Sequence, residues 1–241
     1  MHYIIFFLLL FVSVKAETVH YKVKAPLFGT IGQVDINYNT TQSSYRIDAS
    51  MKTSGFAKTL SGNREEHYQV SGKISGQNYL AQHFKQKAHF KKSNIILEYN
   101  FDYQKKKIRK IKKKWKNSKL INSTDRYLSY FATNDLFSAY HNIVKKLGKR
   151  ADNTSFTIKA AGLEKFHGKL EVSIPSLQQQ QKEARELGVK DVRIFHIITH
   201  KKILGSENGE IIFAVGAGGI AKAVRVLNTS YVSHIDAFLV Q

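Results

Sequence analysis

Three features of the sequence predict a mainly β protein, built as a curved antiparallel sheet or open β-barrel with one packed helix and one exposed inserted helix. Apolar and polar residues alternate in short segments along most of the chain, which is typical of strands that bury one face. Two segments instead carry helical spacing or helix-capping residues. Hydrophobic residues make up 42% of the 241 residues, enough for a packed core, and there is no cysteine to form disulfides.

The first half of the chain contains five alternating series. They are Val19, Tyr21 and Val23; Val34, Ile36 and Tyr38; Tyr45, Ile47, Ala49 and Met51; Tyr68, Val70 and Ile74; and Ile95, Leu97, Tyr99, Phe101 and Tyr103. Residues 39–44 are rich in turn-forming residues, so the second and third series predict a hairpin. From about residue 116 to residue 135 the alternation lapses. We interpret this stretch as a connection inside one domain that spans residues 17–241.

The second half continues the pattern with six further series. They are Phe156 and Ile158; Phe166, Leu170, Val172 and Ile174; Val192, Ile194 and Ile198; Ile211, Phe213 and Val215; Val224 and Val226; and Ile235, Ala237 and Leu239. The glycine-rich residues 216–219 predict a tight turn between two of these strands. Antiparallel sheet is therefore expected to dominate the whole chain.

Two helices are expected among these strands. Apolar residues recur at helical spacing over residues 136–147, with Asn134 as the N-cap and Gly148 able to take the left-handed conformation that closes a helix. This helix is expected to pack on the sheet. Ser176 and Gln179 form a capping box, so the polar run that follows predicts a mostly exposed helix inserted between strands.

Residues 1–16 have the pattern of an export signal. Their apolar run from residue 3 to residue 14 is too short to span a bilayer, and Val14 and Ala16 supply the small residues of a cleavage site. We therefore expect cleavage after Ala16 and an exported mature protein. A short membrane anchor is the alternative interpretation.

The chain is strongly basic, with 38 Lys and Arg against 18 Asp and Glu and a formal charge of +20. Such an excess favours anionic partners but does not determine the fold. For an exported protein the available polyanions are membrane head groups, lipopolysaccharide phosphates and acidic polymers. We therefore expect anionic envelope lipids or polymers as partners. A proteome that is rich in lysine throughout is the alternative explanation.

Basic residues are densest between residues 105 and 119, where there is no acid. The candidate anion-binding residues are Lys105, Lys106, Lys107, Arg109, Lys110, Lys112, Lys113 and Lys114. If the run is helical, Ile108, Ile111 and Trp115 share one face, and the segment suits a membrane surface. If it belongs to a hairpin, the lysines protect an exposed sheet edge. Nucleic acid is disfavoured, because an exported protein seldom meets it and its binding calls for aromatic stacking platforms.

No motif predicts an enzyme, a metal site or a cofactor. The sequence contains no nucleophile elbow, zinc-protease, phosphate-loop or dinucleotide-binding signature. His196 and His200 could chelate a metal on a helix, but their surroundings predict a strand, where residues four apart stand roughly 13 Å from each other. Glu65 and Glu66 are adjacent and would point to opposite faces of a strand. We therefore expect a non-enzymatic protein without metal or cofactor.

Several short motifs, taken in order, carry a family resemblance. They are Val19-His20-Tyr21-Lys22-Val23 with Gly29-Thr30-Ile31-Gly32, Tyr45-Arg46-Ile47, Thr53-Ser54-Gly55-Phe56, Phe101-Asp102-Tyr103, residues 134–140, and residues 216–226 and 231–239. The chain resembles the exported Gram-negative bacterial family called domain of unknown function 3108 (DUF3108). The resemblance implies a periplasmic curved sheet or open barrel with a helix against it, similar in outline to carriers of lipids or lipoproteins. It implies no catalytic residues.

These observations give two main hypotheses of function, and an enzyme that acts on an envelope polymer ranks third. In the first, the protein binds or carries an amphiphilic anionic envelope component, a lipid or a lipopolysaccharide-like molecule, with its apolar part inside the curved sheet and its charge at the basic rim. The candidate cavity-lining residues are Phe101, Tyr103, Phe137 and Tyr140, although aromatic residues at these spacings also fit a plain core. In the second, the protein is an envelope scaffold or assembly factor with protein partners and no ligand cavity.

Overall fold

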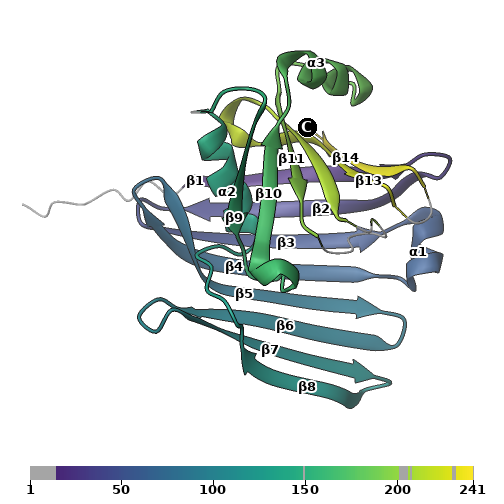
Figure 1. The fold of residues 1–241 in the computed structure, drawn as a ribbon. Helices are drawn as coiled ribbons and strands as arrows, with labels where there is room; N and C mark the ends of the chain where they lie inside the picture. Colours follow the sequence, from purple (N-terminus) through teal and green to yellow (C-terminus); the bar gives the residue numbers. More distant parts are fainter. Residues whose placement is uncertain (1–14, 149, 201–205, 207, 230–231, 241) are drawn as a thin grey trace, which may run out of the picture.

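The structure is a computed structural model that describes residues 15–148, 150–200, 206, 208–229 and 232–240. The expected export signal therefore lies outside the described residues, except for Lys15 and Ala16, which begin the first strand. Within this part of the chain, fourteen strands form one sheet (Figure 1). The strands are β1 Lys15–Ala25, β2 Gly29–Thr40, β3 Ser44–Thr53, β4 Glu65–Ser75, β5 Asn78–Phe90, β6 Ser93–Asp102, β7 Lys107–Lys116, β8 Lys119–Tyr127, β9 Thr154–Lys159, β10 Lys169–Ile174, β11 Arg193–Ile198, β12 Glu210–Val215, β13 Ala221–Leu227 and β14 His234–Val240.

The sheet is an antiparallel meander that curves without closing. β1 pairs with β2 on one side and with β14 on the other, which joins the N-terminal strands to the C-terminal ones. β8 and β9 stand at the two ends of the strand order and, among the described residues, do not pair with each other. Figure 1 shows β9 and β10 crossing in front of the long N-terminal strands. The predicted mainly β, open-barrel fold is confirmed.

Cross-strand register gathers the alternating apolar residues on the face that curves around the central helix, which we call the concave face. One row across β2–β6 consists of Tyr38, Ile47, Val70, Phe84 and Tyr99. The last four of these are buried. Because side chains alternate along a strand, the intervening polar residues lie on the outer, convex face. The hairpin expected around residues 39–44 is confirmed.

Three elements differ from the prediction. β8 lies inside the stretch that the sequence suggests is a connection. All its residues are exposed, so it has no apolar alternation, and its place in the sheet comes from pairing with β7. β5 has a weak pattern because a bulge opposite Ser71 and Gly72 interrupts its alternation. The short helix α1, Gly55–Ser61, buries none of its residues and so leaves no helical signal.

The helix α2, Leu136–Leu147, lies inside the curve, as predicted. Ala139, Ile143 and Leu147 pack against apolar residues of β9–β12 to form the main core. Its N-cap is Asp135 rather than Asn134, because the Asp135 carboxylate accepts hydrogen bonds from two backbone N–H groups of the first turn. Gly148 does not take the left-handed conformation, since its φ is −61° and the helix ends in right-handed geometry.

The helix α3, Leu177–Glu186, is inserted between β10 and β11, as predicted. The side chain of Ser176 accepts a hydrogen bond from the backbone N–H of Gln179. The helix is mostly exposed, but its Gln180 and Glu183 are buried. Residues from its C-terminal end pack with Ile194, Ile212 and other residues on the convex face of β11–β13 in a second, small core. Among the described residues, no helix has the length and apolar character needed to cross a membrane.

Candidate binding surface: the concave face of the sheet

Half of the concave face is filled by the chain itself. The segment that leads from β8 to α2 packs Leu128, Ala132 and Phe137 onto the floor that Tyr45 and Tyr99 help to form. The four aromatic side chains predicted to line a cavity divide accordingly. Phe137 and Tyr140 are packed in the cores on α2, where Tyr140 contacts Phe195 and Phe213 and Phe137 contacts Tyr68. Phe101 and Tyr103 line an open cleft of about 510 Å³ at the β6–β7 turn, although Phe101 also packs against the same core as Phe137 and the Tyr103 hydroxyl donates to the Ala81 carbonyl at 2.8 Å.

Toward the β5–β6 and β7–β8 turns, the concave face of β6 and β7 is less covered by the rest of the chain. Leu97 on β6 stands directly opposite Lys112 on β7, and Ile95 stands opposite Lys114. All four side chains are only half-buried. Figure 1 shows these strands extending away from β10, the strand that crosses in front of the sheet. We call Ile95, Leu97, Lys112 and Lys114 the open strip.

The two lysines of the open strip form no ion pair within the part of the chain that the structure describes. Neither Lys112 nor Lys114 has a carboxylate partner among the residues that the structure describes. Two acids of the concave face are already engaged: Glu66 on β4 is buried and accepts hydrogen bonds from Arg64, Tyr68 and Gln86, and Glu164 pairs with Lys110. The open strip therefore combines two partly buried apolar side chains with two lysines that have no carboxylate partner among the described residues.

The basic run is a strand, so alternation divides its charges between the two faces. The helical interpretation is wrong, and the hairpin interpretation is correct, although the paired strand β8, not β7, forms the edge. The side chains of Lys110, Lys112 and Lys114 lie on the concave face, those of Lys107, Arg109 and Lys113 lie on the convex face, and Lys105 and Lys106 belong to the β6–β7 turn. The eight predicted anion-binding residues are therefore spread over both faces of β7 and the β6–β7 turn.

On the convex face, the charges of β7 are met by acids. Arg109 donates to Asp125 on β8 at 2.8 Å, and the two side chains form an exposed ion pair. The charge of Lys113 also lies near Asp125 and helps to lower the pKa of that carboxyl, after the Arg109 hydrogen bond. On the neighbouring strands, Lys85 pairs with Glu98 at 2.6 Å. On this face of β7, Arg109 is thus paired, and Lys113 lies near the same carboxylate.

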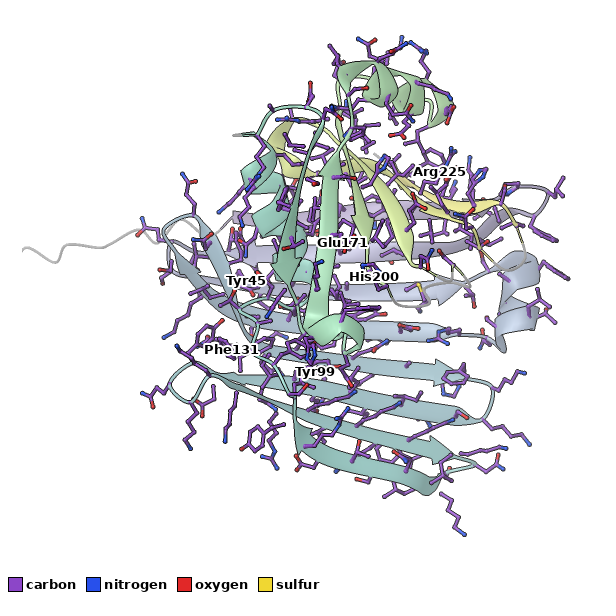
Figure 2. The ribbon with its side chains drawn as sticks, viewed as in Figure 1. Tyr45, Tyr99, Phe131, Glu171, His200 and Arg225 are labelled. Atoms are coloured by element: carbon purple, nitrogen blue, oxygen red, sulfur yellow. The ribbon has the colours of Figure 1, made fainter. Side chains whose placement is uncertain are left out.

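Glu164 links the two unpaired ends of the sheet. It precedes the 3-10 turn η1, Lys165–Gly168, on the β9–β10 connection and forms ion pairs with Lys110 of β7 and Arg126 of β8. The hydroxyl of Tyr99, labelled in Figure 2, donates to the same carboxylate at 3.1 Å. Burial alone would raise the pKa of Glu164, but the hydrogen bonds and positive charges of its partners outweigh it and lower that pKa. No sequence motif indicated Glu164, because its partners lie far away in the chain.

Replacing Glu164 with glutamine is expected to lower the free energy of unfolding by about 1–2 kcal/mol, because it leaves the largely buried Lys110 ammonium without its anion. Urea denaturation at neutral pH measures this change. The matched control is Asp125→Asn, which breaks the exposed Arg109 pair on the convex face of the same strands and should change stability little. Equal losses in the two variants would contradict the linking role.

The two histidines at chelating spacing in the sequence, His196 and His200, each contact a carboxylate. His196 on β11 contacts the Glu183 carboxylate on α3 at 2.8 Å. His200, labelled in Figure 2 beside Glu171, contacts that carboxylate at 3.2 Å. Across the described residues, no group of three or more His, Asp or Glu side chains is placed to hold a metal ion.

The unclosed meander, with a helix inside its curve and an open strip on its concave face, defines a β-barrel-like protein with an accessible inner surface. Residues 18–170 match the family model described as "Protein of unknown function (DUF3108)", and the chain belongs to this family. The fold is similar to the crystal structure of a beta-barrel-like protein of domain of unknown function DUF1849 from Brucella abortus. That chain is 12% identical, the match covers 94% of this chain and 96% of that one, and the TM-score is 0.53. No curated protein matches the chain.

Proposed function

We propose that the protein binds or carries an amphiphilic, anionic component of the bacterial envelope, such as a lipid or a lipopolysaccharide-like molecule, and that it catalyses no reaction. The observation that supports this proposal most directly is the open strip. The proposal places the protein in the periplasm after cleavage behind Ala16, which rests on the pattern of residues 1–16 and on the family resemblance.

The chemistry of the open strip fits such a ligand. An acyl chain laid over Ile95 and Leu97 would leave water, with a gain of about 0.8 kcal/mol for each buried CH₂ group. Directly opposite residues on paired strands have Cβ atoms about 4.5–5.5 Å apart, so the ammonium groups of Lys112 and Lys114 adjoin the same apolar floor. They could then contact a phosphate or carboxylate head group. Because the sheet does not close at β8, the ligand could enter from the side.

The proposal is tested with the double variant Lys112→Gln/Lys114→Gln. We expect it to weaken binding of a fluorescent phosphatidylglycerol by about tenfold or more, since two charge-assisted contacts are lost. The matched control is Lys107→Gln/Lys113→Gln, which removes the same charge from the convex face of the same strand. That control should bind the lipid within about twofold of the unmodified protein. Equal weakening in both variants, or no measurable binding by the unmodified protein, would refute the proposal.

One observation favours the alternative, an envelope scaffold with protein partners. β8 is an edge strand exposed along its whole length, and Leu120, Ile121 and Tyr127 on it are among the exposed large apolar residues. Such an edge can pair with a strand from another chain. Pull-down with the eight basic residues of the run neutralised separates the two functions. A scaffold that uses other surfaces keeps its partners, whereas the lipid carrier loses its ligand.

A further inference from the structure

A second exposed apolar surface lies at one end of the sheet, away from the open strip. Leu27 and Phe28 in the β1–β2 turn are 99% and 42% exposed, and Phe56 and Leu60 on α1 are 52% and 58% exposed. The rings of Phe28 and Phe56 stack with centroids 5.1 Å apart and planes 8° apart. We call these four side chains the apolar tip.

Backbone hydrogen bonds hold the apolar tip in place, although its four side chains are not part of the hydrophobic core. Ser54 donates its backbone N–H to Ile31 at 2.9 Å, which ties the start of α1 to β2. α1 then ends at Gly62, whose φ is 71°. Leu27 has a φ of 68°, a left-handed conformation that is unfavourable for leucine. None of the residues of α1 is buried, so folding alone does not account for two large apolar side chains on it.

Positive charge surrounds the apolar tip. In an antiparallel meander the β1–β2, β3–β4, β5–β6 and β7–β8 connections come to the same end of the sheet, and Figure 1 shows α1 there. These connections, residues 26–28, 54–64, 91–92 and 117–118, contain no acid. The basic residues in or beside them are Lys58, Arg64, Lys91, Lys92, Lys116 and Lys119, against two adjoining acids, Glu65 and Glu66, of which Glu66 pairs with Arg64. Lys91 adjoins α1 directly, because its backbone N–H donates to the Gly62 carbonyl at 2.6 Å.

We propose that the apolar tip docks the protein onto the surface of an anionic lipid bilayer. Large apolar side chains flanked by lysines are typical of segments that enter the interfacial region while their charges meet anionic head groups. An anionic bilayer fits this surface because its head groups can contact the basic residues of the surrounding connections while its interior takes up the apolar side chains. A stable protein partner would instead need roughly 800 Å² of matched surface on each side, more than four side chains on a narrow end supply. The tip would bring the protein to a membrane, and this does not depend on a ligand in the open strip.

The test compares two variants with equal chemistry in different places. Leu27→Ser/Phe56→Ser alters the apolar tip, and Leu177→Ser/Phe166→Ser alters two exposed residues elsewhere. Flotation with phosphatidylglycerol-containing vesicles measures the binding of each purified protein. Mass spectrometry of the same samples establishes at which residue each protein begins. We expect the tip variant to bind the vesicles with an affinity about tenfold or more below that of the unmodified protein. The affinity of the control variant should stay within about twofold of it. Because all four positions are exposed, both variants should fold.

A direct readout accompanies the flotation. With the native Trp115 replaced by Phe, Phe56→Trp should show a blue-shifted emission when anionic vesicles are added, because the new indole leaves water. Equal losses in the two serine variants, equal binding to purely zwitterionic vesicles, or an unshifted emission would overturn the proposal. So would a change of oligomeric state in the tip variant alone, since it would indicate a protein partner. Lys112→Gln/Lys114→Gln should still float with vesicles, which distinguishes failure of the tip from failure of the open strip.

Discussion

Replacing Phe195 with alanine is expected to lower the free energy of unfolding by about 3–5 kcal/mol, among the largest effects of any single substitution. Phe195 on β11 is fully buried and stacks on Phe213, with ring centroids 5.0 Å apart and planes 7° apart. It belongs to the core that joins α2 to β9–β12. Removing the ring would leave a cavity between the helix and the sheet, and well-packed neighbours cannot collapse to fill it.

Urea denaturation of Phe195→Ala measures this loss, and Phe56→Ala is its control. Phe56 is exposed on α1, so the same substitution there removes little buried surface and should change stability by less than about 1 kcal/mol. If Phe195→Ala proved no more destabilising than Phe56→Ala, α2 would not be held in the curve of the sheet as described. Phe195→Leu should fall between the two, because it restores part of the lost volume.

Acidification from pH 7 to pH 5 is expected to destabilise the protein through His141 by roughly 2 kcal/mol. His141 on α2 stacks on Tyr79 and meets the edges of Tyr38 and Tyr140. Burial lowers the pKa of His141 from 6.5 to about 4, with the charge of Lys145 adding to the effect. Between these values the unfolded chain binds a proton that the folded state excludes. The contribution of His141 to the free energy of unfolding is therefore fully present above pH 6.5, and it is lost progressively as the pH falls towards 4.

Asp135, the N-cap of the same helix, acts in the opposite direction. Its burial raises its pKa from 3.8 to about 6, against the hydrogen bonds it accepts from Phe137 and Ser138. The folded state thus binds a proton before the unfolded chain does, and at pH 5 this offsets about 1 kcal/mol of the His141 effect. Asp135→Asn should consequently show a steeper loss of stability on acidification than the unmodified protein.

The two contributions are separated by urea denaturation at pH 7 and pH 5 of His141→Phe and Asp135→Asn. His141→Phe keeps an aromatic ring against Tyr79 but binds no proton, so acidification from pH 7 to pH 5 should change its stability by roughly 2 kcal/mol more favourably than it changes that of the unmodified protein. If His141→Phe and the unmodified protein lost equal stability on acidification, His141 would not be excluded from protonation in the folded state.

Much of the strand pattern could be predicted because alternation records which face of a strand is buried. The rows that contain Ile47 and Phe213 follow this rule, and both helices were located from their spacing or caps. β8 could not be found, because a strand exposed on both faces carries no apolar signal. α1 was missed for the same reason. The N-cap of α2 was displaced by one residue, since Asn134 and Asp135 are equally good caps and only the backbone geometry chooses between them.

The sequence predicted which segment carries the basic residues of the candidate site, but not where each of their side chains lies. The density of lysines in residues 105–114 identified β7 as the basic element, and period-two alternation, once the segment is known to be a strand, assigns each charge to a face. Which charges are compensated could not be predicted. Glu164 reaches Lys110 from another part of the chain, and Asp125 reaches Arg109 from β8. The apolar tip likewise joins Phe28 to Phe56 only because β1–β2 and α1 meet at one end of the sheet.

The sequence by itself determined the strand content, the two longer helices, the excess of positive charge and the membership of the family. Each of these is local or additive, since alternation, capping and charge are properties of neighbouring residues or of sums over the chain. Only the tertiary structure decided that the sheet remains open between β8 and β9, which half of its concave face the chain fills, and which lysines keep their charge free. These properties depend on pairings and ion contacts between residues far apart in the sequence, and such contacts exist only once the sheet has curved around α2.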